Sequence, residues 1–363
     1  MRIVIAGGGT GGHLFPGIAI AEEIMARGNN HKVVFIGTKK GIEHRMLGQL
    51  GYELQEIEIE GVKGRGLKAL INAAYQIPHS MWQSRQILKR FCPDVVIGVG
   101  GYASGPAVVA AAMMRIPTAI AEQNAIPGIT NRILSKFANL IFVTYAQTKE
   151  WFPPSKVIVS GNPVRKVFAG GRVHAKEEKQ YRQLLIFGGS QGAAAINKNT
   201  IAMLPQLRKM KDKLRVLHQT GDREFQIVKQ AYEQQGLVAQ VTPFIVNMAD
   251  AYKEADLIIC RAGATSIAEI TAAGKAAILI PFPFAANDHQ TKNAEVLDCA
   301  GASVIIKEHE LTGESLFGVI EGLLSNKKKL RLMEEASAKL GNIKAAAKIV
   351  DACMELAGKS NKN

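Results

Sequence analysis

The chain has 363 residues, of which 47% are hydrophobic and 21% are charged. This composition is typical of a globular protein with a large core, it excludes a disordered or collagen-like chain, and the length is sufficient for two domains. The 45 Lys and Arg residues exceed the 31 Asp and Glu residues, and the resulting net charge of +14 favours partners that carry phosphate or other negative groups.

The cysteine pattern and the apolar stretches narrow the class further. The four cysteines form no CxxC pair, so we predict neither a structural zinc site nor a disulfide framework, as expected for a cytosolic chain. The apolar run that begins the sequence is too short for a signal peptide. The longest nearly uncharged apolar stretch, residues 276–286, contains two prolines and is too short to span a membrane.

Short apolar runs alternate with helix-like stretches in both halves of the chain. Strands are predicted in the first half at residues 2–6, 32–36, 95–98, 118–121 and 140–143, with helices at 18–26 and 107–115. A second series of strands is predicted at residues 184–187, 215–219, 257–260, 277–280 and 303–306. This βαβ rhythm predicts two parallel sheets covered by helices. We therefore expect an N-terminal domain over residues 1–161, a C-terminal domain over 162–341, and a last helix over 342–363 that packs back on the first domain.

A glycine-rich segment, residues 7–13, follows the first strand and opens a helix. Gly7, Gly9 and Gly12 fit the pattern G-x-G-x-x-G, in which glycines and a helix N-terminus admit a diphosphate, and the number of glycines favours this interpretation over a tight turn alone. A dinucleotide-binding site would need an acid at the end of the second strand, where residues 35–39 offer none. A Walker A loop is excluded because no Gly-Lys-Ser or Gly-Lys-Thr follows.

His13 lies in the first helical turn, where the helix dipole favours the neutral imidazole, so it is a candidate base. A capping or phosphate-binding role is also open.

Three loops of the second half follow predicted strands. Residues 188–192 (GGSQG) form a second phosphate-type loop, and residues 261–269 form a third that ends in Glu269, which either caps its helix or binds the two hydroxyls of a ribose. Residues 281–290 form a stiff loop after the next strand. In the first half, residues 100–106 and 122–124 occupy the matching strand ends, and each of these polar residues could also be a simple cap. Because ligands bind at the carboxyl ends of parallel strands, these loops are expected to surround a site.

The segment between Glu60 and Asp94 contains no acid but six basic residues. Basic and large apolar side chains together are typical of a helix that lies on an anionic membrane, and the alternatives are nucleic-acid binding or an ordinary helix with Trp82 in the core. The candidate membrane residues are Lys68, Leu70, Tyr75, Ile77, Met81, Trp82, Arg85 and Lys89. No RNA-binding pattern or zinc finger supports a nucleic-acid partner. No Asp-x-Asp occurs, and no cluster of ligands has metal spacing, so no metal site is predicted.

Seven segments resemble, in order and spacing, the signatures of the MurG family of glycosyltransferases: GGGTGGHLFPGIAIAEEI, GVGGYASGPAVVAA, AEQNAIPGITN, SGNPVR, IFGGSQGA, CRAGATSIAEI and PFPFAANDHQTKNA. The resemblance covers the chain from about Arg2 to the last helix. Members of this family transfer N-acetylglucosamine (GlcNAc) from UDP-GlcNAc to lipid I, which gives lipid II in peptidoglycan synthesis. The resemblance implies an α/β fold of the GT-B type, in which two Rossmann-like doubly wound domains face each other across a cleft. It also implies an inverting, metal-independent transfer without a cofactor.

The resemblance also implies which residues form the site. The donor site would comprise Thr10, Gly11, Gly12, Asn124, Arg165, Ser190, Ile245, Ala264, Thr265, Ser266, Ile267, Ala268, Glu269 and Gln290. Glu269 would bind the ribose, and the backbone of Ile245 would contact the uracil. Arg165 and Ser190 would lie near the diphosphate. The acceptor side would be lined by His13, Tyr102, Ser104, Glu122, Gln123 and Asn124. The chain has Thr265-Ser266 where the family often has Leu-Thr, so contacts by these two side chains are expected to differ.

The implied reaction requires a base, because the C4 hydroxyl of the lipid-linked MurNAc must lose a proton as it attacks C1 of GlcNAc. His13 is the first candidate and Glu122 the second. We expect UDP-GlcNAc, lipid I and an anionic membrane surface as partners, with other cell-wall synthesis proteins as further candidates, and no nucleic acid. Since lipid I cannot leave the bilayer, the chain is expected to be peripheral at the cytoplasmic face of the plasma membrane. The alternatives are a related nucleotide-sugar glycosyltransferase with another lipid or small-molecule acceptor, and a nucleotide-binding protein that is not a transferase.

Overall fold

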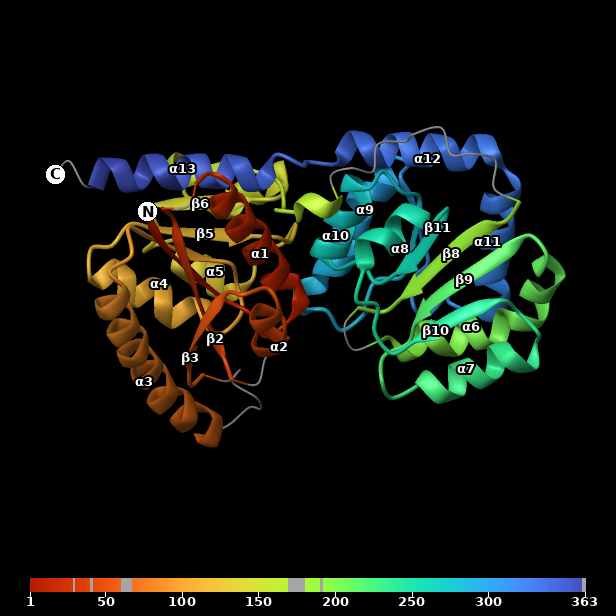
Figure 1. Ribbon diagram of the computed structural model, residues 1–363, viewed down its shortest axis with the longest axis horizontal. Coiled ribbons are helices and arrows are strands. Elements are labelled where there is room, and N and C mark those ends of the chain that lie inside the picture. Colours follow the sequence, from red (N-terminus) through yellow and green to blue (C-terminus); the bar gives the residue numbers. More distant parts are fainter. Residues whose placement is uncertain (29, 40–41, 60–66, 169–179, 190–191, 361–363) are drawn as a thin grey trace. The chain divides into compact units, whose positions relative to one another are not determined.

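The computed structural model describes residues 1–28, 30–39, 42–59, 67–168, 180–189 and 192–360, with the side chains of 42, 45, 67–74 and 360 left undescribed (Figure 1). The chain forms two compact units, Met1–Lys166 together with Ile343–Asn363, and Val167–Asn342. The first unit therefore extends a few residues beyond the expected boundary at 161, and the terminal helix belongs to it. Within the described residues, no helix combines the length and the apolar character needed to cross a bilayer.

The first unit is built on a seven-stranded sheet in which every pair of neighbours is parallel, in the order β3-β2-β1-β4-β5-β6-β7. Its strands are β1 (Arg2–Ala6), β2 (Lys32–Thr38), β3 (Glu53–Ile57), β4 (Val95–Gly98), β5 (Thr118–Glu122), β6 (Leu140–Val143) and β7 (Val157–Val159). The five predicted strands are present close to their predicted bounds. The two strands that were not predicted, β3 and β7, form the two edges of the sheet.

Helices cover both faces of this sheet (Figure 1). They are α1 (Gly11–Ala26), α2 (Ile42–Gln49), α3 (Leu67–Phe91), α4 (Ser104–Met113), α5 (Ile129–Leu134) and α13 (Ala345–Ser360), with short 3₁₀ turns η1 (Ala146–Trp151), η2 (Pro154–Lys156) and η3 (Lys166–Phe168). On one face, Ile18 of α1 and Ile349 of α13 pack together on the strands. On the other face, Leu88 of α3 and Val108 of α4 do the same. The C-terminal helix thus completes the core of the N-terminal unit.

The second unit repeats this plan with a six-stranded parallel sheet in the order β10-β9-β8-β11-β12-β13. Its strands are β8 (Arg182–Phe187), β9 (Leu214–Gln219), β10 (Ala239–Thr242), β11 (Leu257–Cys260), β12 (Ala277–Leu279) and β13 (Ser303–Ile305). Its helices are α6 (Ala194–Leu207), α7 (Phe225–Gln234), α8 (Met248–Glu254), α9 (Ala264–Ala272), α10 (His289–Cys299), α11 (Gly313–Ser325) and α12 (Lys327–Leu340), with the 3₁₀ turns η4 (Arg208–Met210) and η5 (Ala286–Asp288). The edge strand β10 was not predicted.

The two sheets share one topology, because in each the first and fourth strands of the unit lie side by side. The connections from these two strands leave in opposite directions, which opens a crevice at their carboxyl ends where doubly wound folds bind ligands. The pairs that define this position are β1 with β4 and β8 with β11. The prediction of two Rossmann-like doubly wound domains is therefore confirmed.

Candidate active site

The glycine-rich loop between β1 and α1 interlocks with the loop that follows β4. The Gly7 N–H donates to the Ile36 carbonyl (3.0 Å), and the Gly8 N–H donates to the Gly100 carbonyl (3.3 Å). A Cβ on Gly7 would lie 2.4 Å from the Gly100 oxygen, and a Cβ on Gly101 would lie 2.3 Å from the Gly8 oxygen. Packing therefore requires part of the glycine content that the sequence had attributed to phosphate binding. The predicted phosphate residues Thr10 and Gly12 remain exposed, and Gly11 is half-buried.

His13 lies against this pair of loops. Its ring packs on the α-carbon of Gly100, where an added Cβ would come within 2.5 Å of the His13 Cδ2 atom. Its Nδ1 atom is 3.3 Å from the hydroxyl oxygen of Thr10, the N-cap residue of α1. The ring is half-buried, and the guanidinium of Arg165 stacks 4.7 Å from the Phe15 ring, also on α1. An imidazole, a hydroxyl and a cation are thus fixed around the first two turns of α1.

A carboxylate that sequence reasoning missed supports the same loop. Glu43, in the first turn of α2, is fully buried. One of its oxygens accepts the Gly9 N–H (2.9 Å), and the other accepts both the N–H (3.0 Å) and the hydroxyl (2.9 Å) of Thr38. Residues 35–39 contain no acid, as expected, but an acid from the following helix reaches the end of the second strand, and residue spacing did not reveal it. Both of its oxygens already accept protein donors, so the chemistry of a ribose-binding acid is not available to it.

Two residues predicted at the acceptor side, Glu122 and Gln123, face inward instead. Glu122 is 3% exposed, and its two oxygens accept hydrogen bonds from the backbone N–H groups of Asn124 (3.0 Å) and Gly128 (3.1 Å) and from the amides of Asn124 and Asn131. A carboxylate engaged in this way holds the loop after β5 and is poorly placed to take a substrate proton. Gln123 is also 3% exposed and donates to the Val99 carbonyl (3.1 Å).

Of the three acceptor-side residues not yet described, one is buried, one is exposed and one is half-buried. Ser104 begins α4 and is fully buried, with its hydroxyl oxygen packed on the α-carbon of Gly98. Tyr102, in the loop after β4, is 59% exposed. Asn124, in the loop after the neighbouring strand β5, is half-buried. Of the predicted acceptor residues, Tyr102, Asn124 and His13 are thus the ones that reach the surface.

In the second unit, one buried amide links two of the predicted donor loops. Gln219, the last residue of β9, donates to the Gly189 carbonyl (2.8 Å) and accepts the Ile245 N–H (2.8 Å). Ile245 is itself 8% exposed, and its backbone N–H already has this partner. Ser190 lies outside the described residues. Gln219 was not predicted as a site residue, although its position at a strand end is the signal that could have identified it.

The third loop brings β11 to the start of α9. Gly263 is the N-cap residue, and Ala264 to Glu269 form the first turns of the helix. Glu269 is 7% exposed, and burial together with this nearby carboxylate raises the pKa of the Cys260 thiol at the end of β11. Of the remaining predicted donor residues on α9, Thr265 and Ile267 are buried, and Ser266 and Ala268 are half-buried. Gln290, in the first turn of α10, accepts the Phe282 N–H (3.0 Å) and so closes the loop after β12.

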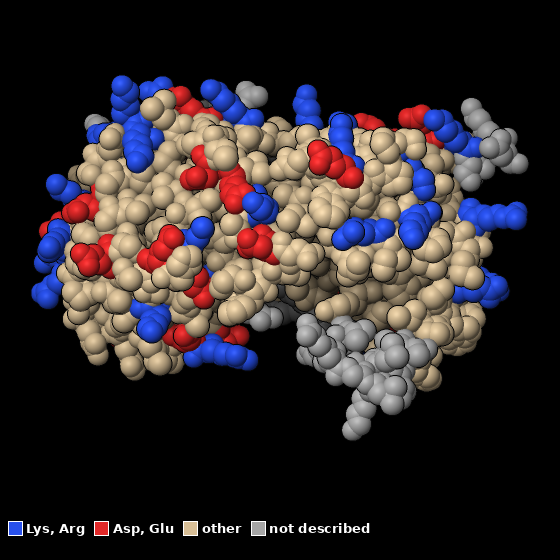
Figure 2. Space-filling view, turned by 180° about the vertical axis from the view of Figure 1, so that it is seen from behind, with Lys and Arg blue, Asp and Glu red and all other residues tan. Residues whose placement is uncertain are grey.

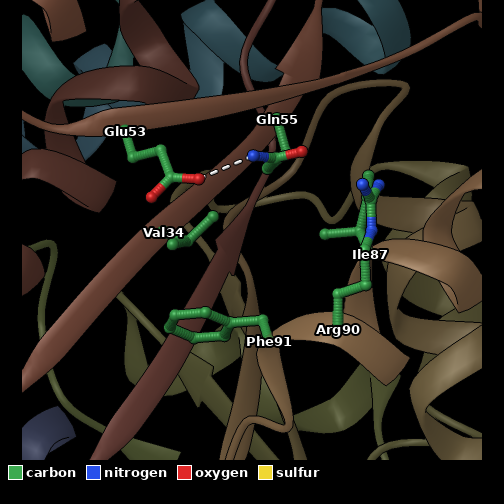
Figure 3. Close-up of a pocket in the computed structure, with 6 residues that line it drawn as sticks. All are labelled: Val34, Glu53, Gln55, Ile87, Arg90 and Phe91. Carbon is green, nitrogen blue, oxygen red and sulfur yellow. Dashed lines mark hydrogen bonds between the residues drawn. The ribbon is translucent and has the colours of Figure 1, made fainter.

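A separate pocket in the first unit, with a volume of about 180 Å³, lies away from these loops (Figure 3). Glu53 and Gln55 of β3 line one side, where the Gln55 amide donates to Glu53 (2.6 Å), and Arg90 and Phe91 of α3 line the other. Since Glu53 begins its strand and pairs with Val34 early in β2, the pocket lies toward the amino end of these strands. It is not part of the candidate site. Within the described ranges, no three His, Cys, Asp or Glu side chains are grouped to hold a metal ion.

The acid-free segment contains the whole of α3, which carries exposed aromatic side chains. Tyr75 is 70% exposed and Trp82 is 57% exposed, and the His79 ring stacks between them at 5.7 and 6.1 Å. The alternative that places Trp82 in the core is therefore wrong. The other described candidates are Ile77, Arg85 and Lys89, which are exposed, and Met81, which is half-buried. Residues 60–66 and the side chains of Lys68 and Leu70 lie outside the described part.

Basic side chains are frequent elsewhere on the same unit. On the face of the N-terminal unit that forms the right-hand part of Figure 2, Lys and Arg side chains are spread over the surface with few acidic side chains among them. In the sequence, residues 1–160 contain 17 basic and 10 acidic residues. The aromatic face of α3 therefore belongs to a unit with a positive surface.

Comparisons with known proteins agree with this architecture. The models of the glycosyltransferase family 28 N-terminal and C-terminal domains match residues 3–143 and 183–352. A UDP-N-acetylglucosamine–N-acetylmuramyl-(pentapeptide) pyrophosphoryl-undecaprenol N-acetylglucosamine transferase of Syntrophus aciditrophicus is 54% identical over 98% of this chain and 99% of its own. A protein of the same description from Myxococcus xanthus is 45% identical over 98% of this chain and 93% of its own.

Solved structures show the same relationship. The crystal structure of MurG from Acinetobacter baumannii is 32% identical and aligns over 98% of this chain and 99% of its own with a TM-score of 0.77. A putative UDP-N-acetylglucosamine 2-epimerase from Listeria monocytogenes aligns over 97% of this chain and 95% of its own with a TM-score of 0.70, but at 13% identity it shares the fold alone.

Proposed function

The chain belongs to glycosyltransferase family 28, and we propose that it transfers GlcNAc from UDP-GlcNAc to undecaprenyl-pyrophosphoryl-MurNAc-pentapeptide (lipid I), which gives lipid II. The observation that carries this function is the 54% identity, over nearly the full length of both chains, to a relative named for this transfer. The enzyme is a hexosyltransferase of peptidoglycan synthesis with the GT-B type of fold.

A single-turnover assay tests this function. The protein is mixed in excess with UDP-GlcNAc labelled in the sugar and with a lipid I analogue, and the disaccharide product is separated. We expect label in the product only when the MurNAc acceptor is present. Label transferred equally well to a sterol or to a glycosylated antibiotic precursor, or no transfer to the lipid I analogue, would refute the assignment.

The acceptor side of the reaction is assigned to the first unit. The attacking group is the C4 hydroxyl of MurNAc, which displaces UDP from the opposite face of C1 and so inverts the anomeric centre. His13 takes the proton of this hydroxyl. Its half-buried ring, held between Thr10 and Gly100, favours it over Glu122, whose oxygens are engaged by Asn124, Gly128 and Asn131. Tyr102 and Asn124 are the remaining surface residues for acceptor contacts.

The donor side is assigned mainly to the second unit. Glu269 binds the ribose hydroxyls, and the segment around Ile245 contacts the uracil with its backbone. Because the Ile245 N–H has Gln219 as its partner, the Ile245 carbonyl is the group that suits a donor from the base, such as the N3–H of uracil. The start of α9, Ser190 and Gln290 bind the rest of the donor.

The negative charge that develops on the leaving diphosphate is stabilised by groups of the protein. The N-termini of α1 and α9 supply positive dipole ends, and Thr10, Gly11 and Gly12 lie at the first of these. Arg165 supplies a full charge, held in place by its stacking on Phe15. This set of donors performs the task that a divalent cation has in other transferases, so we infer that neither a metal ion nor a cofactor is needed.

The lipid-linked acceptor places the reaction at a membrane, and we assign docking to α3. Tyr75 and Trp82 are exposed large apolar side chains on one side of α3, and Arg85 and Lys89 follow on the same side with positive charge. Ile77 is exposed as well, but the helical spacing puts it on the opposite side of α3. An apolar and basic face of this kind binds shallowly to anionic headgroups. The protein is therefore proposed to be peripheral, at the cytoplasmic face of the plasma membrane where the UDP-GlcNAc donor is available.

A further inference from the structure

We propose that Glu43 is a positioning residue for the transfer, which acts on His13 through the glycine-rich loop. This inference rests on the proposed role of His13 as the base. Glu43 lies on α2 and contributes no atom to the exposed part of the candidate site, since its side chain is fully buried. Its importance follows from what its two oxygens hold.

The Glu43 carboxylate joins two separate elements of the first unit. One oxygen accepts the N–H of Gly9, inside the glycine-rich loop, and the other accepts the N–H and hydroxyl of Thr38, at the end of β2. The loop is therefore fixed to the end of β2 by an acceptor with a charge, and such hydrogen bonds are stronger than neutral ones. Gly8 permits this approach, because a Cβ on Gly8 would lie 2.7 Å from the Glu43 carboxylate carbon.

The loop needs an external support because of its conformation. Gly8 and Gly9 have φ values of +136° and +83°, in a region where glycine is flexible and loses the most entropy on being fixed. Gly9 has no neighbouring atom within 4 Å of the position of a Cβ, so side-chain packing does not hold it. The hydrogen bond to Glu43 is thus a main restraint on the direction in which the chain enters Thr10.

Thr10 connects the hydrogen bond between Glu43 and Gly9 to the position of His13. It directly follows Gly9, it caps α1, and its hydroxyl oxygen lies 3.3 Å from the His13 Nδ1 atom. A shift of the loop would move this hydroxyl and the start of α1 together, and with them the imidazole that packs on Gly100. Small displacements of a base lower the rate strongly, because proton transfer requires the donor and acceptor at hydrogen-bond distance.

A double-mutant cycle on kcat for lipid II formation tests the proposal. Glu43→Gln keeps the shape of the side chain but turns one of its two acceptors into an NH₂ group, which cannot serve both Gly9 and Thr38. We expect kcat to fall about ten-fold or more, as for a buried donor that loses its partner. The Kd for UDP is expected to change less than kcat, because Ile245 and Glu269, which are proposed to bind the base and the ribose, lie in the other unit, and only the phosphate contacts at the start of α1 depend on this loop. Glu53→Gln, at the opposite end of the same sheet, is the matched control and should keep the wild-type kcat.

The cycle is completed with His13→Ala, alone and combined with Glu43→Gln. If Glu43 acts through His13, the second substitution changes the rate of His13→Ala by no more than about two-fold. An equal loss in both backgrounds would show that Glu43 only supports the fold and would overturn the proposal, as would a wild-type kcat for Glu43→Gln. A wild-type kcat for His13→Ala would overturn this proposal and the base assignment together, while lipid II formation itself would stand.

Glu43→Asp keeps the test decisive if Glu43→Gln does not fold. The shorter side chain retains the charge but cannot reach both Gly9 and Thr38, so kcat should again fall in the wild-type background and not in the His13→Ala background. Thermal unfolding of each variant shows whether the fold is intact. Equal loss of kcat in both backgrounds would overturn the proposal for this variant as well.

Discussion

Replacement of Tyr75 and Trp82 by Ala is expected to abolish most of the binding of the protein to anionic vesicles. Aromatic side chains each bury roughly 150–250 Å² when they become fully covered. With exposed fractions of 70% and 57%, the two rings offer on the order of 250 Å² for burial in a membrane. At about 25 cal/mol per Å² this corresponds to about 6 kcal/mol as an upper bound, and a shallow insertion realises about half of it. The partition coefficient should therefore fall about 100-fold.

The charges on the same helix provide a second, separable contribution. Arg85→Glu with Lys89→Glu removes two attractions of about 1 kcal/mol each and adds repulsions of similar size. This loss should disappear in high salt, because surface electrostatics are screened within about 10 Å at 0.1 M salt, whereas the loss from the aromatic pair should persist. Arg208→Glu with Lys209→Glu is the matched control, since both residues are exposed in the second unit and the change in net charge is identical.

Vesicle co-sedimentation and two acceptors complete the assay. Ile227→Ala, which removes a side chain that is 65% exposed on α7, is the control for the apolar contribution and should bind vesicles like the wild type. Turnover of lipid I in vesicles should fall with binding, while turnover of a short-chain soluble acceptor should stay close to the wild-type value. The reasoning would be refuted if the Tyr75 and Trp82 variant co-sedimented as well as the wild type, or if it lost both activities equally.

Three further predictions concern the donor. Glu269→Ala should raise the KM for UDP-GlcNAc at least about ten-fold, because charge-assisted hydrogen bonds contribute about 1.5–3 kcal/mol each. Removal of the two ribose hydroxyls from the donor should raise KM less in this variant than in the wild type, and an equal increase in both would contradict ribose binding. Gln219→Met removes both 2.8 Å hydrogen bonds that link Gly189 and Ile245 and should weaken UDP binding in calorimetry about ten-fold. Gln219→Glu should weaken it at least as much, because its buried carboxylate would face the Gly189 carbonyl and cannot donate to it. Unchanged affinity in both variants would refute the link. Turnover should survive excess EDTA, and complete loss that added magnesium or manganese restored would argue for a metal-dependent site.

The sequence predicted the central strands and one edge strand, β13, and it missed the other three edge strands for physical reasons. Central strands of a parallel sheet are covered on both faces, so they are continuous apolar runs such as β1 and β11. The edge strands β3 (Glu53–Ile57) and β10 (Ala239–Thr242) have an open side and contain polar residues that resemble a loop. The edge strand β7 is apolar, but it is only three residues long and lies between the turn with Pro153 and Pro154 and the segment with Pro163, so the whole stretch resembles a loop.

The positions of the site loops followed from the sequence, but the directions of their side chains did not. The positions of the glycine loops after β1 and β8 were predicted correctly, because the order of strands and loops along the chain is enough to locate them. Glu122 and Gln123 were predicted to face a substrate, yet they turn inward because the backbone N–H groups of Asn124 and Gly128 and the Val99 carbonyl need partners. The path of the loop after a strand decides which backbone groups near the strand end need a side-chain partner. Residue spacing contains no information about that path.

The two units use the end of their second strand for the same purpose. In dinucleotide-binding folds an acid at this position binds the ribose. Here Glu43, beside the end of β2, holds Gly9, and Gln219, at the end of β9, holds Gly189, so in each unit the polar group faces its own glycine loop. We therefore expect ribose recognition at the strand on the other side of the topological switch point, where Glu269 follows β11. A nucleotide on the second unit is therefore expected to place its ribose beside α9. Its phosphates are expected to lie against the glycine loop after β8, which Gln219 holds through the Gly189 carbonyl.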